Sequence, residues 1–155
     1  MLALTRQNVP TLDRSKMAPA GELRRGAYVL TETKGKSLDV ILIANGSELH
    51  LAVAAQPELE KDGWAVRVVS MPSFELFAEQ EPIYRDSVLP PSVTKRLAIE
   101  AGGSLCWHKW VGPGGDFIGI DGFGVSGLGN QLFEHFGFSV ENVLARARRL
   151  LTAST

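Results

Sequence analysis

The chain has 155 residues, of which 45% are hydrophobic and 21% charged, with a formal net charge of −1 and one cysteine. This size fits one compact domain, and the composition is typical of a folded globular protein and not of a disordered one. The small net charge provides no general attraction for nucleic acid or anionic lipid, so neither is expected as a partner. Since Cys106 has no second cysteine to pair with, we expect a reducing, cytoplasmic setting.

Residues 1–25 differ from the rest of the chain. Their only apolar patch is Leu2, Ala3 and Leu4, and prolines and basic residues follow it. Such a segment cannot build a hydrophobic core of its own. We interpret it as the end of one strand of a preceding domain followed by a linker, with a second domain over residues 26–155.

From residue 26 onward, strand patterns alternate with helix patterns. In chain order, the sequence predicts strand Ala27–Thr31, strand Asp39–Ala44, helix Glu48–Asp62, strand Trp64–Met71, helix Phe74–Gln80, helix Pro82–Val88, strand Lys95–Glu100, strand Phe117–Ile120, helix Leu128–Phe136 and helix Val140–Leu151. Pro57 is expected to kink or divide the first helix. The last helix has the clearest signal, because Ser139 can cap it and its apolar residues share one face. The alternation predicts a three-layer α/β/α sandwich around a mostly parallel sheet.

A glycine-rich segment joins the last predicted strand to the helix after it. Gly122, Gly124 and Gly127 form a G-x-G-x-x-G pattern that includes Ser126, as in loops where main-chain amides bind a pyrophosphate. The dinucleotide fingerprint also needs a second strand ending in an acidic residue, but the acidic residue at that spacing, Glu141, lies in a predicted helix. We therefore expect a tight structural turn, and keep as the alternative function a regulatory module that binds a nucleotide or another anion at Gly122–Gly129.

No other motif predicts catalysis or metal binding. The position two residues after Ser126 is Leu128, where a nucleophile elbow requires glycine. His50, His108 and His135 each lack a visible partner, and Cys106 has no second ligand pair for a metal. The tryptophans at 107 and 110 are expected to pack in a core or an interface. From the residues alone, we expect an α/β domain without catalytic residues or a metal site.

Eight segments, in order along the chain, resemble the carboxy-terminal end of transketolases. They are ALTRQNVP (3–10), GAYVL (26–30), IANGSE (43–48), VVSMPS (68–73), YRDSVLP (84–90), KWVG (109–112), FGVS (123–126) and FGFSVENV (136–143). The resemblance covers nearly the whole chain. It does not separate transketolase from the similar dihydroxyacetone synthase.

The resemblance implies an enzyme that moves a two-carbon ketol unit between sugar phosphates with thiamine diphosphate and Mg²⁺ or another divalent metal. Family members are homodimers that hold the cofactor between a diphosphate-binding and a pyrimidine-binding domain. Residues 1–25 would be the end of the pyrimidine-binding domain and a linker. Residues 26–155 would be the carboxy-terminal domain, with a five-stranded mixed sheet, no bound cofactor and no catalytic activity of its own.

One functional residue is implied by the resemblance. Arg6, in Thr5-Arg6-Gln7, matches the family arginine that contacts the substrate phosphate, and a guanidinium suits that role because it donates two parallel hydrogen bonds. The chain departs from the family at two places. The Gly-Asp-Gly metal motif is missing, since Phe117 follows Asp116, and glycine stands at 127 where Phe-Gly-x-Ser-Ala-Pro is the frequent family sequence.

Overall fold

The computed structural model describes residues 7–153, which form a mixed, mostly parallel sheet. Its strands are β1 (Tyr28–Glu32), β2 (Val40–Ala44), β3 (Val66–Ser70), β4 (Arg96–Ile99) and β5 (Asp116–Ile118). The five strands lie in the order β1-β3-β2-β4-β5. Strands β2 to β5 run parallel, while β1 pairs antiparallel with β3 at the edge. The predicted sheet is confirmed.

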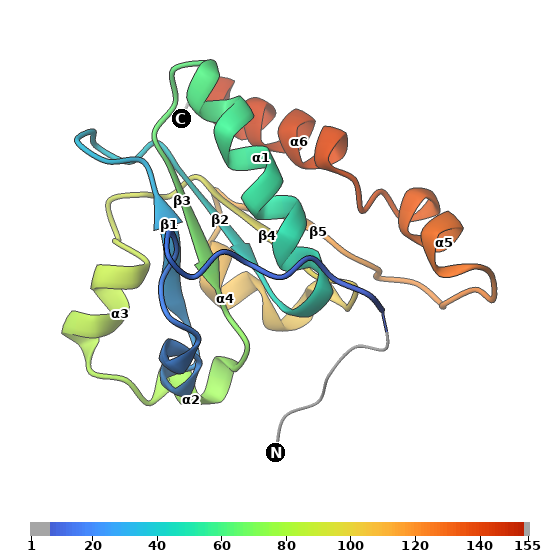
Figure 1. Cartoon of the computed structure of the whole chain (residues 1–155), viewed down its shortest axis with the longest axis horizontal. Helices are drawn as coiled ribbons and strands as arrows, with labels where there is room; N and C mark the ends of the chain where they lie inside the picture. The colour runs from blue at the N-terminus through green and yellow to red at the C-terminus, as the bar shows by residue number, and fades with distance from the viewer. Residues whose placement is uncertain (1–6, 154–155) are drawn as a thin grey trace.

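Helices cover both faces of the sheet, as Figure 1 shows. They are α1 (Leu49–Lys61), α2 (Phe74–Ala78), α3 (Pro82–Val88), α4 (His108–Val111), α5 (Gly129–His135) and α6 (Val140–Thr152), and short 3-10 helices span Ala20–Arg25, Gly46–Glu48 and Ser104–Cys106. One buried cluster lies between the sheet and α1 with α6, and the other lies against α2, α3 and α4. This arrangement confirms the three-layer α/β/α sandwich.

Strand β2 lies in the middle of the sheet, and all five of its residues are buried. Successive side chains of a strand point to opposite faces. Val40, Leu42 and Ala44 accordingly pack under α1 and α6, while Ile41 and Ile43 pack against the other helices. A continuous apolar run is what a strand covered on both sides requires.

Helix α6 follows its sequence pattern closely. The Ser139 hydroxyl accepts a hydrogen bond from the Asn142 amide at 3.2 Å, which confirms the predicted cap. Val143, Ala147 and Leu151 are buried on the face that contacts α1.

Pro57 does not divide α1, which is one helix of 13 residues. The predicted division is therefore wrong. Pro57 is on the exposed side of the helix, while Ala52, Ala55 and Leu59 are buried. Packing of this buried face offsets the hydrogen bond that proline cannot make.

The segment from 7 to 25 packs on the domain more than its composition predicts. Leu12, Met17 and Leu23 are partly buried against the core cluster beneath α1. Gly26 ends the segment at φ 81°, where a Cβ would lie 2.2 Å from the Phe77 amide nitrogen, so only glycine fits. The predicted strand end at residues 2–4 and Arg6 lie outside the described residues. Among residues 7–153, no helix is long and apolar enough to cross a membrane.

Candidate functional site

In this sheet, a ligand site is expected at the carboxyl ends of strands β2 and β4. The connection after β2 covers one face through α1, and the connection into β4 covers the other through α2 and α3. Open α/β sheets bind ligands in the crevice where neighbouring connections diverge in this way. Asn45 follows β2 and Glu100 follows β4 at this edge.

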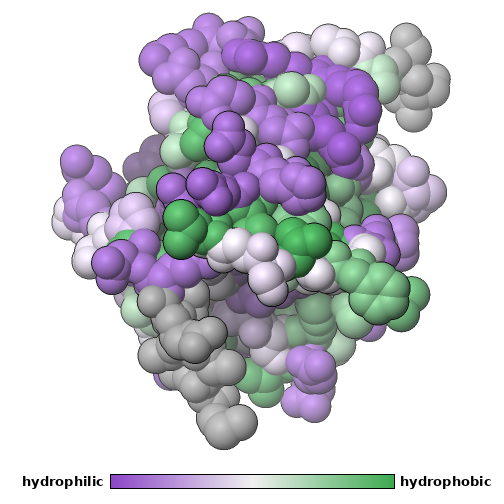
Figure 2. All heavy atoms as spheres, turned by 90° about the vertical axis from the view of Figure 1, so that its right-hand side faces the viewer, coloured by the Kyte–Doolittle hydropathy of each residue, from purple (hydrophilic) through white to green (hydrophobic). Residues whose placement is uncertain are grey.

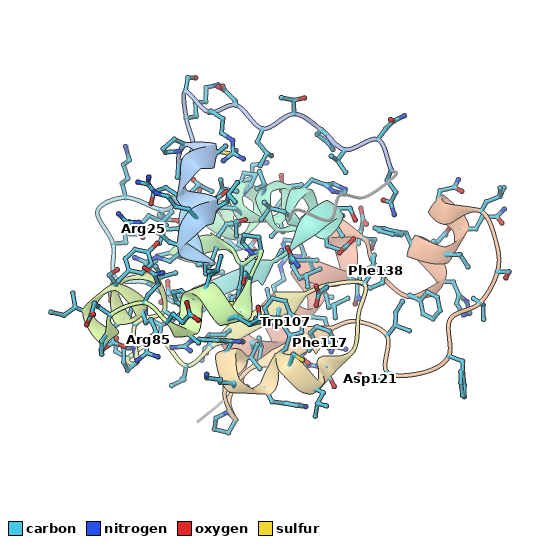
Figure 3. All side chains as sticks on the ribbon, turned by 90° about the horizontal axis from the view of Figure 1, so that it is seen from below. Arg25, Arg85, Trp107, Phe117, Asp121 and Phe138 are labelled. Carbon is cyan, nitrogen blue, oxygen red and sulfur yellow. The ribbon has the colours of Figure 1, made fainter. Side chains whose placement is uncertain are left out.

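Glu100 joins three parts of the chain. Its carboxylate accepts a hydrogen bond from the Asn45 side-chain amide at 3.0 Å and one from the Trp107 indole at 2.7 Å. Trp107 is fully buried, so its N–H needs a protein partner. Figure 3 shows Trp107 beside Phe117, and the two rings are stacked 6.1 Å apart. Glu100 thereby holds the segment after β4 against the end of β2.

Glu48 lies at the same edge as the partly buried Glu100 and is itself buried, with 4% of its surface exposed. It accepts hydrogen bonds from the Ser47 hydroxyl and, at 3.2 Å, from the Ala101 amide. A buried charge is tolerated when it is hydrogen-bonded in this way. Glu48 therefore fixes the start of α1 to the residue after Glu100.

Asp121 holds the segment after β5 in a similar way. The Ser104 amide donates to its carboxylate at 2.7 Å. This main-chain hydrogen bond is the largest cause that lowers the pKa of Asp121 below its ordinary value. Because Asp121 precedes the glycine-rich segment, the bond fixes the point from which that segment leaves the domain.

Two hollows lie where the segment near Gln7 meets α5. The larger, about 530 Å³, is lined by Gln7, His50 and Glu134 among others. The smaller, about 210 Å³, is mostly apolar and has Gln7 and Phe138 in its wall. In the larger hollow, His50 Nδ1 donates a hydrogen bond to the Ser47 carbonyl, which fixes its ring at the first turn of α1.

The glycine-rich segment does not form a close cradle in this structure. A Cβ on Gly122 or Gly124 would meet no atom within 4 Å, and one on Gly127 would meet only the Leu132 side chain. Ser126 is exposed, and α5 has only seven residues. The anion-binding alternative stays a prediction.

The described residues do not fit thiamine diphosphate with its metal. Between residues 7 and 153, no group of three or more His, Cys, Asp or Glu side chains could hold a metal ion. The Asp116 carboxylate is paired with Arg146 at 2.7 Å and with Arg149 at 2.8 Å. The hydrogen bonds of Glu48, Glu100 and Asp121 hold segments of this domain together.

Sequence reasoning missed the roles of Asn45, Glu48 and Glu100. Each follows a strand closely, which is the one signal available in the sequence. Their partners lie 53 and 55 residues away along the chain, so no local spacing indicates the pairs. The arrangement becomes visible only when parallel strands bring their carboxyl ends together.

Known proteins resemble this chain along most of its length. The transketolase from Staphylococcus epidermidis strain RP62A is 48% identical over 149 residues, which is 96% of this chain and 22% of that protein. The transketolase from Streptococcus pyogenes serotype M6 is 53% identical over 142 residues, which is 92% of this chain and 19% of that protein. This chain therefore spans about a fifth of the length of these relatives.

Solved structures have the same fold. The transketolase from Pichia stipitis in complex with sedoheptulose 7-phosphate has a TM-score of 0.82 and 34% identity, over 94% of this chain and 20% of that one. The transketolase from Leishmania mexicana has a TM-score of 0.77 and 37% identity, over 84% of this chain and 18% of that one. These comparisons lend no support to the nucleotide- or anion-binding alternative. The family model of the transketolase-like TK C-terminal domain matches residues 26–139, and the chain belongs to that family.

Proposed function

We propose that this chain works as the carboxy-terminal domain of a transketolase, an enzyme that transfers a two-carbon ketol unit between sugar phosphates. One observation carries the proposal. The chain matches transketolases over 92% or more of its length, yet it spans only 19% to 22% of theirs. In this proposal residues 1–25 are the end of the pyrimidine-binding domain and a linker, and residues 26–155 are the carboxy-terminal domain.

Thiamine diphosphate and Mg²⁺, or another divalent metal, would be bound by the other domains of the full enzyme. We propose a homodimer for the full enzyme and a structural role in assembly for this domain. A cytoplasmic location is consistent with the single free thiol of Cys106.

Arg6 is proposed to contact the phosphate of the sugar substrate. Support comes from its match to the family arginine and from its neighbour Gln7, which lines both hollows beside α5. A sugar phosphate held there by Arg6 would lie between this domain and the domain before it.

A chimera tests the proposed function. In the transketolase of Bacillus subtilis, the matched 150 residues, 47% identical to this chain, are replaced by this chain. We expect the chimera to transfer ketol units from xylulose 5-phosphate to ribose 5-phosphate with thiamine diphosphate and Mg²⁺. The 155-residue chain alone should show neither transfer nor heat of binding in calorimetric titration with the cofactor. Ketol transfer by the chain alone would contradict the proposal, and so would a folded chimera without activity.

A further inference from the structure

We propose that residues 121–128, here called the apolar loop, together with α5 form a docking surface for the domain that precedes this one in the full enzyme. The inference rests on the proposed function and names the surface through which this domain joins the assembly. Five features of the structure carry it: exposure of large apolar side chains, main-chain amides that donate no hydrogen bond within residues 7–153, a neighbouring apolar hollow, a fixed base, and the position of Gln7.

The apolar loop exposes large apolar side chains without covering anything in this chain. Phe123 is 99% exposed, Leu128 67% and Val125 51%. Every residue from 121 to 130 is exposed. Grouped apolar side chains on a surface mark interaction sites more often than single exposed ones do. Figure 2 looks onto the side of the molecule from which α5 projects, and apolar atoms gather across its middle.

The main-chain amides of the apolar loop are not used in hydrogen bonds within the described part of the domain. No amide from 121 to 128 donates a hydrogen bond to another of the described residues. Main-chain amides are strong donors that need a partner once water is excluded. The loop therefore stays solvated in this chain, and it offers both side chains and amides to a protein surface.

An apolar hollow of about 210 Å³ lies beside the loop. Gly124 and Val125 of the loop line it together with Leu132, Phe136 and Phe138. The exposed Phe123 ring and this neighbouring hollow give the surface one protrusion and one depression. Such a relief suits close packing against a complementary protein surface.

The base of this surface is fixed. Asp121 is held by the Ser104 amide at its start. At the other end, the Phe133 ring of α5 lies 5.2 Å from the Phe138 ring, which is buried in the core. Gly137 then turns the chain at φ 77°, and its carbonyl accepts a hydrogen bond from Asn142 at 2.8 Å. A surface held in place before binding loses less conformational entropy when it docks.

The position of Gln7 indicates that the preceding domain is what contacts this surface. It lines the hollow beside the apolar loop as well as the larger hollow against α5. Most of each relative's length lies outside the part that matches this chain, and in the proposed function the preceding domain is joined to this one through the residues before Gln7. A domain attached at this point has a high effective concentration at the surface, so a small apolar contact is enough.

The low charge of the apolar loop indicates what kind of protein surface it would contact. Asp121 is the only charged residue between 121 and 129, and its carboxylate already accepts the Ser104 hydrogen bond. The preceding domain should therefore present an uncharged, mostly apolar surface with a recess for the Phe123 ring.

Amide hydrogen exchange tests the proposal in the isolated chain and in the Bacillus subtilis chimera. We expect amides 122–128 to exchange fast in the isolated chain and on the order of tenfold slower in the chimera. The double variant Phe123→Ser/Leu128→Ser should restore fast exchange and lower the unfolding midpoint of the chimera. The same variant should leave the midpoint of the isolated chain unchanged. Ile83→Ser on α3 is the matched control, since Ile83 is 87% exposed and lies outside this surface.

Three results separate the possible failures. Equally fast exchange in the chimera and in the isolated chain would overturn the docking surface, even if the chimera is active. Protection in an inactive chimera would support the docking surface and count against the proposed function. A stable dimer of the isolated chain that Phe123→Ser dissociates would mean that a second copy occupies the surface, and would also overturn the proposal.

Discussion

Arg96 shows how a single charged side chain holds several loops of this domain together. Its guanidinium donates to the carbonyls of Val93, Trp110, Leu89 and Pro90 at 2.8 to 3.1 Å. Burial lowers the pKa of Arg96, but a guanidinium remains charged at neutral pH. The side chain thus connects β4 to the turn after α3 and to the end of α4.

Replacing Arg96 should destabilise the domain. Arg96→Ala removes four hydrogen bonds to main-chain carbonyls, and we expect a loss of about 2 kcal/mol in the free energy of unfolding. Arg96→Lys should recover only part of it, because one ammonium cannot reach carbonyls in four directions. Urea denaturation of both variants measures this, with the exposed Arg24→Ala as control. Full stability of Arg96→Lys would show that charge alone is needed there.

At the scale of elements, Asp116 connects β5 to α6. Its carboxylate contacts Arg146 and Arg149 of α6, and the Phe117 amide donates to it at 2.9 Å. Burial raises the pKa of Asp116, but the hydrogen bonds from Phe117 and the two arginines outweigh burial and lower the pKa below 3.8. A carboxyl with a lowered folded-state pKa stabilises the fold above its unfolded pKa.

The Asp116 contacts should therefore give the domain a pH-dependent stability. We expect Asp116→Asn to lower the free energy of unfolding by about 1–2 kcal/mol at pH 7, since the arginines are partly exposed. The difference from wild type should shrink as the pH falls below 3.8, the ordinary aspartate pKa, because the unfolded chain then gains a proton that the folded Asp116 takes up only at lower pH. Urea denaturation at pH 7 and pH 3 measures it, with exposed Asp86→Asn as control. An equal difference at both pH values would exclude an ionic contribution.

At the scale of the whole molecule, the features of the proposed docking surface lie on one side of the domain. Gln7, the hollows and the apolar loop lie together beside α5, and Figure 1 shows α5 standing apart from the main body of the sandwich. The proposed role of Arg6 belongs to this junction, since a substrate phosphate there would need both domains.

The Arg6 proposal predicts a defect specific to phosphorylated substrates. In the chimera, Arg6→Ala should raise the KM for a ketose phosphate about tenfold or more, because a charge-assisted hydrogen bond contributes on the order of 1.5–3 kcal/mol. The KM for an unphosphorylated ketose should stay unchanged. Arg14→Ala is the control, as Arg14 is exposed and donates to the Ala18 carbonyl at 2.7 Å. Equal effects on both substrates would contradict a phosphate contact.

The local elements of the domain could be predicted from the sequence. The apolar run at 40–44 and the Ser139 cap each depend on neighbours a few residues away, so strand β2 and helix α6 were recognisable. Helix α4 could not be predicted, because four residues are too few to show a helical period. The burial of Trp107 and Trp110 in the core stabilises this turn of helix.

The sequence by itself determined the alternation of strands and helices, the sandwich and the family, because side-chain periodicity and ordered motifs are local properties. Only the tertiary structure decided that Asn45 and Trp107 share the carboxylate of Glu100. The parallel strands β2 and β4 bring Asn45 and Glu100, 55 positions apart, to one edge of the sheet, and the segment after β4 folds back to place Trp107 there. It also decided that the glycine-rich segment lies exposed with Phe123 outermost. The exposure of a segment depends on which parts of the folded chain pack over it, and the local sequence does not show this.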